Sequence, residues 1–103
     1  MKEIFMKVTA LLPSSEPNAV SMSDLACLLD ISERDLRSLV ERMRRDGIGV
    51  CSSDNGYWLP ADDEQGQQDI ERTARRLESR ARSQLKTAQR MRESSGTGAA
   101  DER

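Results

Sequence analysis

The chain of 103 residues contains no histidine, two cysteines, and one residue each of Phe, Tyr and Trp. Without histidine, His-based acid/base chemistry and His metal ligation are excluded. Cys27 and Cys51 lie far apart and neither has a CxxC partner, which argues against a zinc site. We therefore predict no metal and no cofactor, and two buried structural thiols in a reducing cytoplasm. A disulfide between them is the alternative.

Long apolar runs are missing too. No segment approaches the roughly 20 apolar residues of a transmembrane helix, and the first 15 residues carry Glu3 and only a short apolar run, unlike a signal peptide. The sequence thus predicts a soluble, cytoplasmic protein with no membrane partner. Apolar residues make up only 36% of the chain, so part of it is expected to lie outside the core.

Catalytic patterns are missing as well. The sequence has no phosphate-binding glycine loop and no nucleophile motif. Its one acidic cluster, Asp62-Asp63-Glu64, has no companion group of ligands and is typical of a solvated linker. We predict that the protein is not an enzyme and binds no small-molecule ligand.

The segment of residues 21–47 predicts two helices joined by a tight turn. Ser23 is a suitable N-cap for a first helix over residues 24–29, and residues 30–32 supply the turn. Ser32 is the expected N-cap of the second helix, because a Ser hydroxyl can accept the backbone N–H groups left unpaired there.

The second helix is expected to run to about Asp46 and to stop at Gly47, since glycine commonly follows a helix end. Asp35, three residues after the N-cap, gives a short-armed version of a capping box. Apolar residues at helical spacing predict one buried stripe: Leu36, Leu39, Val40 and Met43. The opposite face is polar and mostly basic: Arg34, Arg37, Ser38, Glu41, Arg44 and Arg45.

An amphipathic helix is also predicted over residues 2–12, with Pro13 ending it because proline has no N–H to donate. Its apolar face is formed by Ile4, Phe5, Val8, Leu11 and Leu12. Residues 14–21 form a loop, in which Ala19 and Val20 either make a very short strand or pack on the core.

After Gly47, the sequence predicts a β-hairpin. A β-prone run over residues 48–51 precedes a turn at Asp54-Asn55-Gly56, since Asn and Gly tolerate the positive φ of tight hairpins. The return strand covers residues 57–59 and stops at Pro60. Tyr57 and Trp58 alternate on it, so one is expected in the core and the other is expected to stack or to remain half exposed.

The predicted order is helix, helix, turn, helix and hairpin, and it resembles the winged helix-turn-helix family of DNA-binding domains over residues 2–60. The sequence SERDLRSLVERMRRDGIGVCSSDNGYWLP, followed by a basic helix, is also similar to small winged-helix proteins encoded by prophages. The resemblance implies that the second helix of the motif enters the major groove. It also implies that the hairpin tip contacts the DNA backbone or the minor groove.

Residue chemistry indicates which side chains would contact double-stranded DNA. Arginine matches the paired acceptors of guanine, and further cations suit phosphates. The predicted contacts are Ser32, Arg34, Arg37 and Ser38 near the helix start, Arg42, Arg44 and Arg45 further along, and Ser53 and Asn55 at the hairpin tip. Against this, Glu33, Asp35 and Glu41 bring negative charge to the same helix. The alternative is a solvated face with Arg37 and Glu41 as an i,i+4 pair.

Net charge is −2, but the charge is unevenly distributed. Residues 1–68 hold 7 Lys and Arg against 12 Asp and Glu, whereas residues 69–93 hold 8 against 4. The latter segment predicts a basic helix with a heptad stripe, widened by Leu85: Ile70, Ala74, Leu77, Ala81, Gln84, Ala88 and Met91. We expect this stripe to form a homodimer. The alternatives are that the helix folds back on its own domain, or that it lies along DNA through its cations: Arg72, Arg75, Arg76, Arg80, Arg82, Lys86, Arg90 and Arg92. A membrane-surface role would need large aromatic residues that the helix lacks.

The expected fold class is therefore mostly α with a small β-hairpin, a winged helix-turn-helix followed by a long C-terminal helix. The expected divisions are a DNA-binding domain (1–60), an acidic linker (61–68), a basic dimerising helix (69–93) and a disordered tail (94–103). The predicted function is sequence-specific binding of double-stranded DNA by a small phage or bacterial transcriptional regulator. A replication or excision accessory protein of a mobile element and a protein-interaction module are the alternatives.

Overall fold

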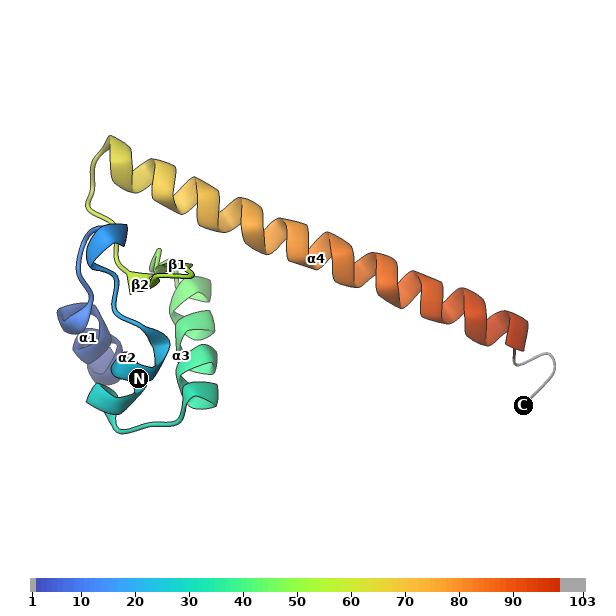
Figure 1. Cartoon of the computed structure of the whole chain (residues 1–103), viewed down its shortest axis with the longest axis horizontal. Helices are drawn as coiled ribbons and strands as arrows, with labels where there is room; N and C mark the ends of the chain where they lie inside the picture. The colour runs from blue at the N-terminus through green and yellow to red at the C-terminus, as the bar shows by residue number, and fades with distance from the viewer. Residues whose placement is uncertain (1, 99–103) are drawn as a thin grey trace. The chain divides into compact units, whose positions relative to one another are not determined.

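The computed structural model describes residues 2–98 and is mostly helical, with one small hairpin and a long C-terminal helix (Figure 1). Chain segments up to Thr73 form one compact unit, and those from Ala74 onward form a second. The elements are α1 (Lys2–Leu11), the 3-10 helix η1 (Glu16–Asn18), α2 (Met22–Leu29), α3 (Glu33–Arg45), β1 (Cys51–Ser53), β2 (Gly56–Trp58) and α4 (Glu64–Gly98). The predicted fold class and order of elements are confirmed.

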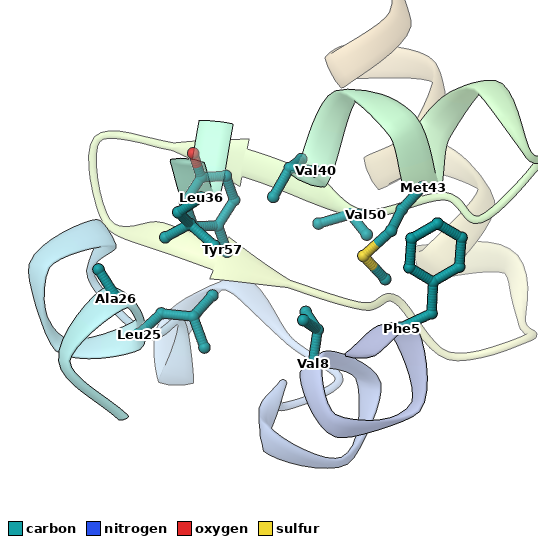
Figure 2. Packing of buried hydrophobic residues seen from close by; sticks show 9 residues of the cluster. All are labelled: Phe5, Val8, Leu25, Ala26, Leu36, Val40, Met43, Val50 and Tyr57. Atoms are coloured by element: carbon teal, nitrogen blue, oxygen red, sulfur yellow. The ribbon is translucent and has the colours of Figure 1, made fainter. Parts of the chain in front are cut away.

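The core of the first unit is the meeting point of three helices and one face of the hairpin. Figure 2 shows the buried side chains that meet there: Phe5 and Val8 from α1, Leu25 and Ala26 from α2, Leu36, Val40 and Met43 from α3, and Val50 and Tyr57 from the hairpin region. The predicted stripe of α3 is thus buried, with Leu39 packed at its margin. Helical periodicity alone was enough to identify these positions.

Helix α2 begins two residues earlier than predicted. Ser21, not Ser23, is its N-cap, with extended backbone (φ −64°, ψ 156°) and an Oγ that accepts the N–H of Asp24 at 3.1 Å. Ser23 lies inside the first helical turn, where it cannot act as a cap. At the other end, Asp30 takes the left-handed conformation (φ 58°) and turns the chain toward α3.

Helix α3 begins as predicted. The Oγ of Ser32 accepts the N–H of Asp35 at 3.0 Å, which is one half of the proposed capping box. After Arg45, Gly47 adopts φ 91°, a conformation that glycine reaches without steric cost. Both ends of this helix were therefore predictable from local chemistry.

The hairpin pairs Cys51 with Trp58 and Ser53 with Gly56, and an isolated β-bridge joins Tyr57 to Val20 in the loop before α2. Val20 exchanges two backbone hydrogen bonds with Tyr57, at 2.8 and 3.0 Å, so the loop before α2 supplies a third strand position. The positive φ of the turn falls on Gly56 (125°), where a Cβ would lie 2.3 Å from the carbonyl oxygen of Val20. Val20 thus forms a one-residue β-bridge and also packs against the core, so both alternatives for it hold in part.

Both faces of the hairpin are covered. Tyr57 is buried in the three-helix core, and Trp58 is buried too, with 1% of its surface exposed. The indole Nε1 of Trp58 donates to Asp69 Oδ2 at 3.0 Å, so the first turns of α4 cover the face of the hairpin that the core does not. The prediction that one of these rings stays half exposed is wrong, because Asp69, at the start of the predicted basic helix, packs on the second face of the hairpin.

The two thiols differ from each other. Cys51 is buried, and this burial raises its pKa, whereas Cys27 is exposed and both are free. The prediction of a buried Cys27 is wrong, because the inward positions of α2 are Leu25, Ala26 and Leu29. A residue one position after Ala26 is turned by about 100° away from that face.

Helix α4 begins at Glu64, five residues before the predicted start. Asp63 is its N-cap in effect, since its Oδ1 accepts the N–H of Gly66 at 2.8 Å. Gly66 is buried against Ala61, whose carbonyl oxygen would lie 1.8 Å from an added Cβ. The acidic linker predicted at 61–68 is therefore largely a helix start, and the first unit extends past the predicted boundary at residue 60.

The far end of α4 also differs from the prediction. The helix continues to Gly98, so residues 94–98 are helical rather than part of a disordered tail. The remainder of the predicted tail, 99–103, lies outside the described residues.

Candidate nucleic-acid interface

The first two turns of α3 present the residues predicted to read base edges. Arg34, Arg37 and Ser38 are exposed, and Ser32 is exposed at the N-cap, with its hydroxyl oxygen accepting from Asp35. They lie opposite the buried Leu36, Val40 and Met43, so core packing fixes the helix while leaving this face outward. The arrangement provides two guanidinium groups and a hydroxyl on one helical surface.

The charge of α3 is graded along its axis. Glu33 and Asp35 lie in the first turn, and Arg42, Arg44 and Arg45 in the last, a distribution that complements the helix dipole. Five arginines against three carboxylates leave the helix moderately basic. Part of this charge therefore has a structural use in stabilising α3, whatever it binds.

Arg44 does not face outward with the other arginines. Its Nε donates to the carbonyl oxygen of Val50 at 2.9 Å, and its Nη2 donates to Ser52 Oγ at 3.1 Å. The side chain is half-buried and ties the last turn of α3 to β1. The predicted phosphate contact at Arg44 is thus replaced by a positioning role, because the hairpin folds back onto this turn.

Glu41 pairs with Arg45, at 3.4 Å between Oε1 and Nη2, and both side chains are largely exposed. The sequence-based alternative had paired Glu41 with Arg37 instead. An exposed pair of this kind contributes little stability, roughly 0.3–0.5 kcal/mol. Arg34, Arg37 and Arg42 are exposed as well.

The hairpin tip turns toward a carboxylate. Asn55 Nδ2 donates to Glu16 Oε2 at 3.4 Å, and the backbone N–H of Asn55 donates to Ser53 Oγ at 3.1 Å. A hydrogen bond from Ser53 is the main reason why the pKa of Glu16 is lowered; partial burial opposes this shift, and Arg72 adds to it. The two tip residues predicted to contact DNA are thus brought together with Glu16 of η1.

This placement changes what the tip can do. Phosphate oxygens would meet Asp54 and the ionised Glu16 beside the polar groups of Ser53 and Asn55. The two carboxylates would repel a phosphate, because like charges repel. The side chains of Ser53 and Asn55 also already have hydrogen-bond partners. The structure therefore disfavours the hairpin tip as a phosphate contact, and the candidate interface consists mainly of the exposed residues of α3.

Asp69 is a residue whose importance the sequence did not reveal. It is 3% exposed and accepts hydrogen bonds from Trp58 Nε1, from Gln65 Nε2 at 3.1 Å and from Arg72. Burial alone would raise the pKa of Asp69, but these three donors together lower it. The cluster joins hairpin and helix across 11 positions of sequence, so no local pattern could have indicated it.

Arg72 completes this cluster rather than a DNA-binding stripe. It bridges Asp69 and Glu16, with 3.4 Å between its Nη1 and Glu16 Oε1, and the hydrogen bond to Asp69 is the main reason why its pKa is raised. The sequence-based placement of Arg72 along DNA is thus at odds with the structure. The bridge links η1, the hairpin tip and α4 within the first unit.

Comparisons with protein-family models, with curated proteins and with solved structures found no match to this chain. Within the part of the chain that the structure describes, no helix is both long and apolar enough to cross a membrane. Between residues 2 and 98, no group of three or more Cys, Asp or Glu side chains could hold a metal ion.

The heptad stripe divides between the two units. Ile70 belongs to the first, where its Cδ1 lies 3.2 Å from the position that a Cβ on Gly49 would take, so it packs on the segment before β1. The other predicted positions, with Leu85, lie in the second unit. There Leu77, Leu85 and Met91 are 40%, 59% and 67% exposed.

Proposed function

We propose that this protein binds double-stranded DNA in a sequence-specific way, as a small phage or bacterial transcriptional regulator. The observation that carries the proposal is the outward face of α3: Ser32, Arg34, Arg37 and Ser38 are exposed on a helix that directly follows another helix and a tight turn. A helix held in this way can lie in a major groove and present its first turns to base edges.

The chemistry of that face suits base recognition. Arg34 and Arg37 can each donate two hydrogen bonds to guanine O6 and N7, and Ser38 can donate or accept at neighbouring bases. Arg42, further along the helix, suits a phosphate. The mixed charge of α3 makes a single copy a weak binder, which favours a protein that binds as a pair.

The pairing proposed is a homodimer through the heptad stripe in the second unit, from Ala74 to Met91. Large apolar residues on this stripe are well exposed in the single chain, and a second copy would cover them. Symmetric dimers bind two half-sites, which multiplies a modest affinity for each. Ile70, which is 44% exposed, also packs in part on Gly49 within the first unit.

The same DNA-binding residues would serve a replication or excision accessory protein, but no observation favours that role over transcriptional regulation. A protein-interaction module is the second candidate, and a specific feature favours it. Acidic residues outnumber basic ones over residues 1–68, and Asp54 is exposed at the hairpin tip beside Glu16 of η1. A basic partner protein would be the expected ligand in that case.

The deciding experiment is selection of bound sequences from a random duplex pool, followed by binding measurements against salt concentration. Affinity should fall linearly on log–log axes, since each neutralised phosphate releases counterions. Arg34→Ala and Arg37→Ala should each reduce the preference for the selected sequence by roughly 5- to 100-fold, the worth of a bidentate contact.

The matched control is Lys7→Ala, which removes one exposed cation from α1. It should leave the sequence preference unchanged. Absence of duplex binding at low salt would reject the proposal in favour of the protein-interaction module.

A further inference from the structure

The segment of α4 in the second unit has two chemically distinct sides. With each residue turned by about 100° from the last, the heptad stripe occupies one side. Four exposed cations occupy another, which we call the basic face: Arg75, Arg82, Lys86 and Arg90. The midlines of the two sides are separated by roughly 155° around the helix axis. They therefore lie almost opposite each other.

The surroundings of the basic face add to its charge. Over residues 74–94, all seven cations are exposed and only two carboxylates, Glu78 and Glu93, accompany them. Glu78 lies between the heptad stripe and the basic face, and Glu93, three residues after Arg90, lies on the basic face itself. Arg75, Arg76 and Glu93 each have an interaction partner, so the charge is partly neutralised. The seven cations still exceed the two carboxylates by five, which leaves the segment strongly basic.

We infer that the basic face binds the phosphate backbone of nucleic acid without reading its sequence, while a second copy covers the heptad stripe. From Arg75 to Arg90 the face extends about 22 Å, at 1.5 Å per residue. That is close to two-thirds of a duplex turn of about 34 Å. A line of cations of this length matches the regularly spaced charges of a nucleic-acid strand.

The placement of the cations argues against a lipid surface as the partner. A helix that lies in a membrane interface inserts its apolar face, with cations flanking that face at the headgroups. On α4 the cations of the basic face are furthest from the apolar residues, so insertion of the stripe would direct them away from the lipid. The stripe in the second unit also contains no aromatic residue, and three of its seven residues are alanine, which buries little area.

Because the two faces are opposed, dimerisation and phosphate binding do not compete. A pair of helices joined along the heptad stripe would carry one basic face on each outer side. The inference about the basic face does not depend on base reading by α3, although it rests on the proposed homodimer for what covers the stripe.

The test uses the full chain with Arg82→Gln, Lys86→Gln and Arg90→Gln combined. Binding to a 30-base-pair duplex of random sequence is followed by fluorescence anisotropy over a range of salt concentrations. The slope of log affinity against log salt should become shallower by up to about 3 per chain, and affinity at low salt should fall at least about tenfold. The ratio of affinities for selected and random sequences should stay unchanged.

A charge-preserving control, Arg82→Lys with Arg90→Lys, should keep the original slope. An unchanged slope and affinity in the glutamine variant would overturn the inference. Tighter binding of the parent protein to phosphatidylserine vesicles than to the duplex would overturn it in favour of lipid. Loss of a dimer in the glutamine variant, seen by sedimentation, would refute the division into two faces.

The result is separable from the proposed function. If no sequence is selected and the Arg34 and Arg37 variants behave like the parent, base reading by α3 fails. In that case, a shallower slope of log affinity against log salt in the glutamine variant would still support phosphate binding by the basic face.

Discussion

At the scale of single residues, Asp69 shows how a charged side chain can be buried at a junction between elements. Trp58, Gln65 and Arg72 each donate to its carboxylate, which satisfies it where water is excluded. Arg72 forms ion pairs with both Asp69 and Glu16, so removing the carboxylate charge of Asp69 would leave it the pair with Glu16. The residue therefore holds α4 against the hairpin by specific contacts rather than by area alone.

These contacts predict how stability depends on pH. The pKa of Asp69 is lowered in the folded protein below its ordinary value of 3.8, so the unfolded chain binds the proton more readily. Its stabilising contribution is fully present above pH 3.8 and is lost as pH falls through the lowered folded pKa. Urea unfolding from pH 7 to pH 2 should show this decline for the parent protein and a shallower one for Asp69→Asn.

At pH 7, Asp69→Asn should lower the free energy of unfolding by roughly 1–3 kcal/mol, as expected for a buried charged acceptor that loses a partner. Asp54→Asn, an exposed carboxylate at the hairpin tip, is the control and should change it by less than about 0.5 kcal/mol. Equal effects from the two variants would contradict the assignment of Asp69 to a buried junction.

At the scale of elements, the start of α4 is where local preference and tertiary packing disagree. Glycine is unfavourable inside a helix by about 1 kcal/mol relative to alanine. Gly66 nevertheless occupies the first turn, because Ala61 approaches it too closely for any Cβ. The sequence QGQQ therefore resembles a linker, although the cap at Asp63 and the packing of Asp69 on the hairpin place it in a helix.

Gly66→Ala separates these two effects. Helix propensity predicts stabilisation, whereas the 1.8 Å approach to the Ala61 carbonyl oxygen predicts a clash that costs roughly 1–3 kcal/mol. We expect a net loss in the free energy of unfolding, measured by urea denaturation. Ser79→Ala, at an exposed position of the same helix, should leave stability unchanged or slightly raised. A stabilised Gly66→Ala would show that Ala61 does not pack there.

At the scale of the whole molecule, the proposed function requires two copies of a chain whose own reading helix is mixed in charge. The first unit includes Asp69 and Arg72, so a deletion from residue 69 would damage its packing as well as the stripe. Substitutions confined to the second unit test dimerisation more cleanly.

Ala81→Glu with Ala88→Glu places two charges on the heptad stripe, where burial against a second copy would be unfavourable. Sedimentation equilibrium should show a monomer. The matched control, Ser79→Glu with Ser83→Glu, adds the same charge at exposed positions outside the stripe and should remain a dimer. If both variants sediment alike, the stripe is not the dimer contact.

Local chemistry in the sequence determined the helix stripe of α3, both its ends, and the hairpin that follows it. Each depends on residues within a turn or two of one another, as with Ser32 and Asp35, so periodicity and capping preferences were sufficient. The exposure of Arg34 and Arg37 followed from the same pattern, since the side of a helix opposite its buried stripe faces outward.

Tertiary structure alone determined the hydrogen bonds and the burial of side chains whose partners lie far away in sequence. Arg44 is held by Val50 and Ser52, the hairpin tip by Glu16, and Trp58 by Asp69. Such contacts form only once the elements are packed, because hydrogen bonds between distant residues depend on where the chain brings their donors and acceptors. Local sequence thus determines where α3 lies and which side of it is apolar, and the folded chain determines which of its cations stay exposed.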